Sequence, residues 1–260
     1  MSMITLSELQ GYLNSLLYYD KKMNLLKIDP HMANGIHVKG AERIKKIGIG
    51  VSASLKLFQM AAEKHCQALV VHHSINFPQF NTYESLFQNR FAFLIKNNLS
   101  LFGYHFLLDS HPEIGHNIEI LKYIGATPTK PFLFHDEPWG YIGEIKPTKL
   151  DDIIKKLKPE LSSNLKLYDF GPKIIKKIAV CSGRGVPFSS ELTYLTTNKV
   201  DLYITGENSE WIKEIFRESG INYLAGGHYH TERFGLLALE KKIKKDLNVE
   251  TEFLELENEV

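Results

Sequence analysis

The sequence lacks several features that would assign a function class directly. It contains only two cysteines in 260 residues, Cys66 and Cys181, too few for a disulfide framework or a thiolate zinc site. No apolar run reaches the ~18–20 residues that a membrane helix needs. The N-terminal residues show no basic stretch followed by an apolar one, so we expect no secretory signal. We therefore expect a cytoplasmic protein.

The sequence also lacks an excess of charge of either sign. Lys and Arg number 31 against 30 Asp and Glu, which leaves a formal charge of +1. This balance provides no global field that favours nucleic acid or an anionic membrane, which weakens the case for a nucleic-acid partner without excluding one. There is no lysine-containing phosphate loop and no Gly-x-Ser-x-Gly turn, and Gly48-Ile49-Gly50 lacks the third glycine of a dinucleotide site. We expect no nucleotide cofactor.

Segments typical of strands and helices alternate along the chain, which predicts an α/β fold. The apolar patterns predict two series of strands, at 45–53, 68–72 and 99–104 and again at 176–183, 200–204 and 221–225. Helices are predicted between them, at 54–65, 84–97 and 209–220. KKIAVCSG, which opens the second series, resembles KKIGIGVS, which opens the first. We therefore predict two similar α/β lobes that arose by internal duplication.

These lobes define the predicted domains, a first α/β lobe at 1–127 and a second at 128–260. The second includes an insertion-like segment at 130–175, which is rich in proline and predicts a strand at 139–145 and a helix at 150–157. A helix with Ser7 as its cap is predicted at 6–19. A helix at about 232–246 and a strand at about 250–256 are predicted to end the chain.

Two adjacent histidines, His72 and His73, end the apolar strand predicted at 68–72 and are the most informative residues of the chain. Open α/β sheets bind their ligands at the carboxyl ends of strands. Successive residues of a strand point to opposite faces. Where the chain turns away from the strand, however, two neighbouring imidazoles can serve two neighbouring metal ions.

The third strand of each series is followed by a histidine and, four residues later, a carboxylate. The two pairs are His105 with Asp109 and His228 with Glu232. Residues at this interval can meet on one helical face or across a tight turn. Glu207 follows the second strand of the second series. Together with the histidine pair, this set offers imidazole and carboxylate ligands, which suits Zn, Mn, Fe or Co, and it is large enough for a second ion.

Three further histidines leave alternatives open. His230 could replace His228 as a ligand, although only His228 keeps the interval of four to Glu232. His111 and His116 belong to the loop that follows the first pair, and we interpret them as residues that line the site.

These segments together resemble the Nif-three-like family, whose bacterial members are commonly called GTP cyclohydrolase I type 2 homologues. The stretches that carry the resemblance are VVHHSINF at 70–77, YHFLLDSHPEIGHN at 104–117, TGENSE at 205–210 and AGGHYHTERFG at 225–235. They span essentially the whole chain. The chain departs from the family at Ser74, where Gly or Pro is usual, at Asn208, where a hydrophobic residue is usual, and at the additional Gly227.

The resemblance implies two divalent metal ions per chain, zinc, iron or manganese, in a dinuclear cleft between the two lobes. It implies that His72 and Asp109 bind one ion and that His73 and His228 bind the other. Glu232 would bridge both ions. His105 would lie next to the metals or one layer behind their ligands.

The resemblance further implies a metal-dependent hydrolase in which hydroxide attacks a nucleotide or a related small molecule. We predict His105 and Glu207 as the catalytic groups that move protons. Arg184 could pair with a phosphate or be a solvated loop residue. The alternative hypothesis is a non-catalytic protein that binds or handles metal or serves as a regulatory scaffold.

A homo-oligomer, the ring-shaped hexamer, is also implied by the resemblance. The residues themselves support it through two aromatic-rich segments, Phe77-Pro78-Gln79-Phe80 and Phe132-Leu133-Phe134, whose wide exposure would be costly.

Overall fold

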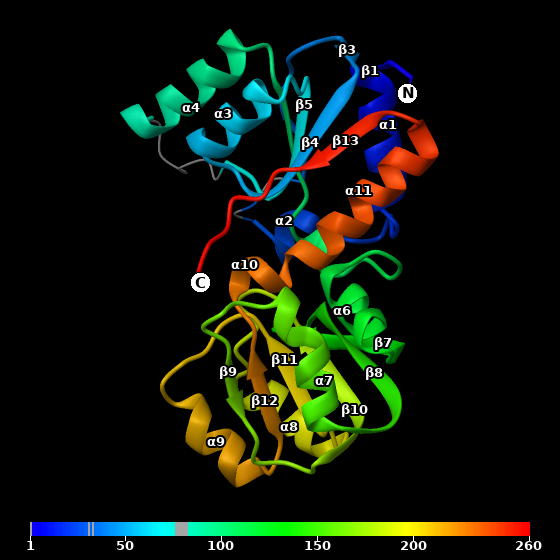
Figure 1. Cartoon of the computed structure of the whole chain (residues 1–260), viewed down its shortest axis with the longest axis vertical. Helices are drawn as coiled ribbons and strands as arrows, with labels where there is room; N and C mark the ends of the chain where they lie inside the picture. The colour runs from blue at the N-terminus through cyan, green and yellow to red at the C-terminus, as the bar shows by residue number, and fades with distance from the viewer. Residues whose placement is uncertain (1, 31, 33, 76–82) are drawn as a thin grey trace. The chain divides into compact units, whose positions relative to one another are not determined.

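The computed structural model describes residues 2–30, 32, 34–75 and 83–260, and these have a mixed α/β fold, as predicted (Figure 1). The chain divides into two compact units, the first comprising Met1–Leu108 and Leu236–Leu256 and the second Asp109–Gly235 and Glu257–Val260. The predicted duplication and the predicted domain boundaries stay predictions. Within the described residues, no helix is long and apolar enough to span a bilayer.

The first unit is built on a five-stranded sheet. Its strands, in spatial order, are β13 (Glu250–Phe253), β4 (Lys46–Ser52), β5 (Ala68–His73), β6 (Ser100–Gly103) and β2 (Gly35–Val38). The first four are parallel, and β2 pairs antiparallel with β6 at the edge. Because β5 lies in the middle of the sheet, its apolar residues are fully buried, and this strand meets solvent only at its own carboxyl end.

Helices cover both faces of this sheet. They are α1 (Leu6–Leu17), α3 (Leu55–Glu63), α4 (Ser85–Lys96) and α11 (Arg233–Leu247). Figure 1 shows α3 and α4 on one side of the sheet and α1 and α11 on the other. A two-stranded sheet, β1 (Ile4–Thr5) with β3 (Arg43–Ile44), and a short helix, α2 (Leu25–Ile28), complete the unit.

The first helix begins at Leu6, as predicted, but its capping residue differs from the prediction. Thr5, not Ser7, is the cap of α1: its hydroxyl accepts the Glu8 N–H at 3.1 Å, and the Glu8 carboxylate accepts the Thr5 N–H at 2.7 Å. This reciprocal pairing is a capping box, which satisfies two donors where a lone serine would satisfy one.

The second unit is built on a six-stranded sheet. Its strands, in spatial order, are β7 (Thr127–Phe134), β8 (Glu137–Lys149), β10 (Ile174–Cys181), β11 (Leu202–Thr205), β12 (Asn222–Ala225) and β9 (Lys166–Tyr168). The three strands β10, β11 and β12 are parallel, and their neighbours on both sides pair antiparallel.

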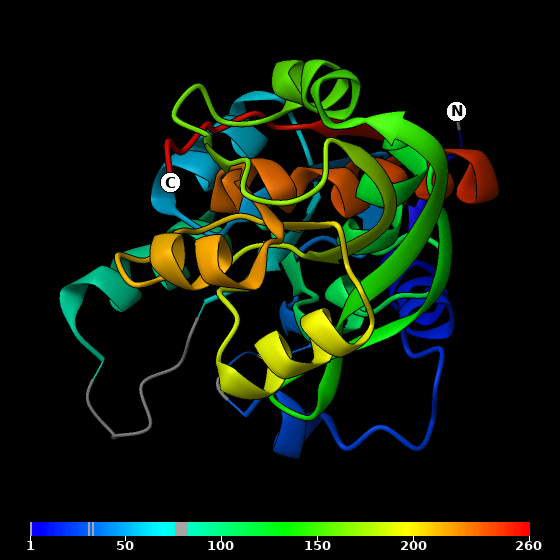
Figure 2. The ribbon, with the colours of Figure 1, turned by 90° about the horizontal axis from the view of Figure 1, so that it is seen from below.

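Two apolar cores, one on each face of this sheet, hold its helices. The first core joins α6 (His116–Ile124) and α7 (Leu150–Leu157) to the sheet, and the second joins α8 (Ser189–Thr197) and α9 (Ile212–Ser219) to the opposite face. Figure 2 shows α7 and α8 on opposite sides of the unit. The short helices α5 (Phe106–Asp109), α10 (His228–Thr231) and η1 (Lys158–Glu160) lie in the connections.

Strand β7 was missed by the sequence analysis because it contains Pro128 and Pro131, which cannot donate to a neighbouring strand. The structure places β7 at the edge of the sheet, where the missing donors are tolerated, with register shifts along its pairing to β8. Phe132 and Phe134 are buried within the unit, which removes this segment's support for an oligomer. The other segment cited for it, Phe77-Pro78-Gln79-Phe80, lies outside the described residues.

Candidate metal centre

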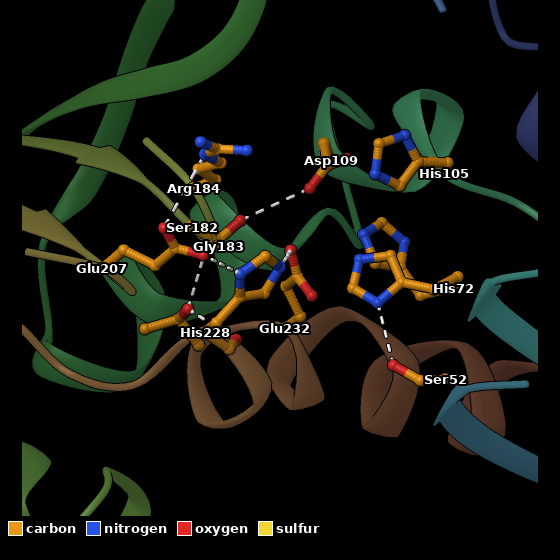
Figure 3. Close-up of polar contacts among 12 residues, drawn as sticks. Ser52, His72, His105, Asp109, Ser182, Gly183, Arg184, Glu207, His228 and Glu232 are labelled. Atoms are coloured by element: carbon orange, nitrogen blue, oxygen red, sulfur yellow. Dashed lines mark hydrogen bonds and ion pairs between the residues drawn. The ribbon is translucent and has the colours of Figure 1, made fainter. Parts of the chain in front are cut away.

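Three imidazoles gather at the carboxyl ends of two neighbouring strands of the first unit. His72 and His73 end β5, and His105 follows β6 by two residues. Each offers a ring nitrogen, and these nitrogens lie within 4.8 Å of one another. The ring centroids of His72 and His105, both labelled in Figure 3, are 4.7 Å apart. Because β5 and β6 are adjacent in the sheet, His105 lies beside His72 and His73, as the sequence predicted.

The ring of His72 is held in one orientation by the backbone. Its Nδ1 lies 2.9 Å from the carbonyl oxygen of Tyr104, and since a carbonyl only accepts, Nδ1 carries the proton. Nε2 is then the nitrogen with an available lone pair. The Nδ1 of His73 is paired in the same way, with the hydroxyl of Ser52 at 2.9 Å. A hydroxyl can donate or accept, so here the tautomer is not fixed by the partner.

His105 is oriented by a carboxylate, Asp29, that sequence analysis did not identify. The His105 Nδ1 lies 2.8 Å from Asp29 Oδ2, which also accepts the Phe106 N–H at 3.3 Å. Burial would raise the pKa of Asp29, but its hydrogen bonds and its proximity to His105 outweigh burial and lower that pKa. The carboxylate therefore stays ionised, holds the proton on Nδ1 and leaves Nε2 of His105 to accept.

In the second unit, His228 lies between two carboxylates, as Figure 3 shows. Its Nδ1 is 2.7 Å from Glu207 Oε1 and its Nε2 is 3.0 Å from Glu232 Oε1. Burial alone would lower the pKa of His228, but Glu232 and Glu207 together raise it to about 9. A metal ion at Nε2 would take the place of a proton there, while the hydrogen bond to Glu207 would be kept.

Gly183 gives the Glu232 carboxylate its space. It follows β10 with a φ of +60°, and a β-carbon at this position would collide with Glu232 Oε1. Its N–H donates to the Thr231 hydroxyl at 3.0 Å. A side chain here would therefore be strained and would displace the carboxylate. The preceding residue, Ser182, donates from its hydroxyl to Asp109 Oδ1 at 3.4 Å.

Three other histidines of the second unit, His111, His116 and His230, are arranged differently. His116 Nδ1 accepts the Gly235 N–H at 3.1 Å, and His111 Nδ1 accepts two backbone N–H groups. An accepting Nδ1 leaves the proton on Nε2, so both rings are donors there. His230 Nε2 lies 3.4 Å from a Glu257 carboxylate oxygen. Of the two histidines left open by the sequence, His228 is the one placed between the predicted carboxylates.

Glu207 also borders a cavity of about 280 Å³ within the second unit. Its polar lining includes Ser162, Asn164, Lys166, Asn208 and Glu259. The second Glu207 oxygen lies 3.8 Å from Arg184 Nε, and the Arg184 side chain is 85% exposed. Arg184 thus extends from the same edge of the sheet into solvent.

Neither cysteine contributes a thiolate. Cys66 and Cys181 are both buried and free, and burial raises the pKa of the Cys66 thiol to about 11. Burial raises the pKa of Cys181 as well. The donors therefore remain imidazoles and carboxylates, a set that fits a divalent first-row metal. The predicted residues His72, His73 and His105 are brought together in one unit, and His228, Glu232 and Glu207 in the other.

Comparison with known proteins gives the chain its family. The model of the Duf34/NIF3 (NGG1p interacting factor 3) family matches residues 5–259. A relative from Archaeoglobus fulgidus is 33% identical over 225 residues, which is 86% of this chain and 89% of the relative. One from Escherichia coli K12 is 30% identical over 244 residues, 92% and 95% of the two chains. Both are named GTP cyclohydrolase 1 type 2 homolog.

Solved structures agree with this relationship. The structure of protein ybgI, whose function is described as unknown, is 29% identical with a TM-score of 0.85, covering 99% of this chain and 100% of that chain. Reduced HcgD from Methanocaldococcus jannaschii is 22% identical with a TM-score of 0.83, covering 98% and 100%, and shows likeness of fold alone. The resemblance found in the sequence motifs is therefore confirmed, and the chain belongs to the Duf34/NIF3 family.

Proposed function

We propose that this chain is a metal-dependent hydrolase with a dinuclear centre, acting on a nucleotide or a related small molecule. The observation that carries the proposal is the use of Nδ1 in the four candidate ligand histidines. A carbonyl, a hydroxyl and two carboxylates engage the Nδ1 atoms of His72, His73, His105 and His228. Metal-binding histidines are commonly held by such a partner, which orients the ring and directs the other nitrogen at the ion.

In this proposal both units contribute ligands. His72 and Asp109 would hold one ion, His73 and His228 would hold the other, and Glu232 would bridge them; zinc, iron or manganese fits these donors. Two such ions, when bound, supply Lewis acidity and hydroxide near neutral pH. The two lobes would be copies of one unit, each bringing strand ends to the site.

The residues behind the ligands keep protons in place. Asp29 holds the proton on His105 Nδ1, so His105 can exchange a proton with substrate at Nε2 or bind metal there. Glu207 holds the proton on His228 Nδ1, and its other oxygen lies toward Arg184. We assign His105 to proton transfer. Glu207 orients a ligand, His228, and because it also borders the cavity it is a candidate for proton transfer as well.

The test compares two histidine variants in a turnover screen over nucleotides, phosphoesters and cyclic amides, each assayed with added zinc, iron or manganese. A hydrolase loses both metal and activity in His228→Ala and keeps both in His230→Ala. A parent protein that binds metal fully but turns over no substrate would instead support the non-catalytic alternative.

We also propose a homo-oligomer, a hexamer by resemblance to the family, located in the cytoplasm. Light scattering of the purified chain checks the first point, and a monomer mass at working concentration would refute it.

A further inference from the structure

Three aromatic rings from three separate segments form a strip at one edge of the second unit. His135 lies in the turn between β7 and β8, Phe188 directly precedes α8, and Trp211 directly precedes α9. The ring centroids of His135 and Phe188 are 5.5 Å apart with planes tilted by 37°, and those of Phe188 and Trp211 are 5.7 Å apart with a tilt of 33°. Phe188 is 52% exposed and Trp211 36% exposed. Contiguous exposed apolar groups often mark a binding or interaction site.

The strip is fixed by a buried carboxylate. Glu191, only 3% exposed, accepts the His135 N–H at 3.1 Å with one oxygen and the Phe188 N–H at 2.9 Å with the other. His135 also has a φ of +51°, a conformation that non-glycine residues rarely adopt. One ionised side chain therefore joins the β7–β8 turn to the start of α8 and holds two of the three rings in register.

The strip also lies where ligands bind in this class of fold. Phe188 and Trp211 follow β10 and β11, so both stand beyond the carboxyl ends of parallel strands. Arg184 precedes Phe188 by four residues and Glu207 precedes Trp211 by four, and these two side chains meet at 3.8 Å. A ligand with an aromatic part and an anionic part would find a stacking surface and a cation on adjoining loops.

We propose that His135, Phe188 and Trp211 form a platform on which a planar heteroaromatic ring stacks, with Arg184 receiving an anionic group of the same ligand. Bases stack on such side chains through their π-faces, which gives affinity for the ring with little dependence on which base it is. A guanidinium is suited to a phosphate or carboxylate on the ligand. The inference rests on the proposed function only in naming its class of substrate, since ring binding requires neither metal nor turnover.

The experiment uses Trp211 as its own reporter. The chain contains two tryptophans, Trp139 and Trp211, so in a Trp139→Phe variant of the full chain the tryptophan emission comes from Trp211 alone. Adenosine, guanosine and their 5′-monophosphates are titrated, with ribose 5-phosphate as the probe that lacks a ring. We expect saturable quenching by both nucleosides, tighter binding of both monophosphates and no response to ribose 5-phosphate.

Variants in the same background separate the parts of the platform. Phe188→Leu should weaken binding of every ring-containing probe about tenfold. Arg184→Gln should remove the advantage of the monophosphates over the nucleosides. Ile174→Ala, which shortens another exposed apolar residue of the same unit, should leave binding unchanged.

Two results would overturn the proposal. One is the absence of saturable quenching by any ring-containing probe. The other is unchanged binding in Phe188→Leu, and if that variant also lowered the mass measured by light scattering, the strip would instead be a contact between copies of the chain. None of these measurements involves metal or turnover. A failure of the stacking proposal therefore leaves the proposed metal-dependent hydrolase untouched, and a failure of the metal-content test leaves the stacking proposal untouched.

Discussion

The two units present different kinds of ligand. The first unit offers three imidazoles, His72, His73 and His105, each supported by a different type of partner. The second unit offers one imidazole, His228, placed between the carboxylates of Glu207 and Glu232. A neutral imidazole brings a nitrogen donor but no charge, whereas a carboxylate offsets the charge of a cation. In the proposed metal centre, the first unit would set ligand geometry and the second would supply most of the compensating charge.

The largest expected effect is in the charge-supplying unit. Glu232→Gln keeps the side-chain volume but removes a negative charge. If Glu232 bridges two cations, the substitution deprives both cations of that compensating charge. We expect the variant to lose at least one metal equivalent per chain. Metal content of the purified protein, measured by mass spectrometry beside a circular-dichroism spectrum, checks this.

The fold should survive this substitution because the buried apolar residues of the strands and helices, which dominate the burial on folding, are left unchanged. His230→Ala is the matched control, since His230 lies in α10, the short helix that Glu232 directly follows, and pairs with Glu257 instead. Full metal content in Glu232→Gln, or a loss in His230→Ala as severe as in His228→Ala, would show that the ligand set is wrong.

The next effect concerns pH and also belongs to the second unit. The two carboxylates raise the pKa of His228 from 6.5 to about 9, so in the metal-free chain the extra proton is held more tightly when folded than when unfolded. The stabilisation it provides is complete below pH 6.5 and is lost as the pH rises through about 9. Metal binding at Nε2 must release this proton, so affinity for metal should rise about tenfold per pH unit from 7 to 9 and then level off.

Competition with a chelator of known pH dependence measures how metal affinity rises with pH. Thermal melts of the metal-free protein measure the accompanying fall in stability with pH. Glu207→Gln should move the levelling-off to lower pH, because one of the groups that raises the pKa is removed. An affinity that is flat between pH 7 and 9 would show that His228 is not protonated there or does not bind metal.

The two orienting carboxylates allow a direct comparison of the units. Asp29 holds His105 in the first unit, and Glu207 holds His228 in the second. Loss of such a partner commonly reduces metal affinity about 10–100-fold. We expect Glu207→Gln to fall in this range, and Asp29→Asn to fall in it only if His105 binds metal, as measured by chelator competition. If Asp29→Asn changes turnover but not affinity, His105 moves protons and does not bind metal.

The sequence predicted the ligands better than the groups that hold them. Each ligand follows a predicted strand, and the order of strands in an α/β sheet brings such positions together. Asp29 could not be found in this way, because it reaches His105 across 76 residues of sequence from beyond a short helix. Ser52 and Gly183 likewise show their roles only when strand pairing and the φ angle are known.

The fold shows the same division between local and long-range information. Apolar periodicity predicted the central strands and the helices beside them within a few residues. It did not predict that β13, near the C-terminus, pairs with β4 of the first unit, because pairing partners leave no mark in local periodicity. The edge strand β7 was missed for a different reason, since its prolines disfavour a strand unless its edge position is known.

The smallest expected effect is at the weakest support in the first unit. Ser52 holds His73 through a single neutral hydrogen bond of 2.9 Å, and removal of such a bond costs roughly 0.5–1.5 kcal/mol. Ser52→Ala should therefore weaken metal binding by about 2–10-fold, less than Glu207→Gln. The matched control is Ser74→Ala, since the Ser74 hydroxyl pairs with the ring of His37, which is outside the proposed ligand set. A loss in Ser52→Ala as large as that in Glu207→Gln would mean that orientation by charge in the second unit is no stronger than orientation by a hydroxyl in the first, and the contrast drawn between the two units would fail.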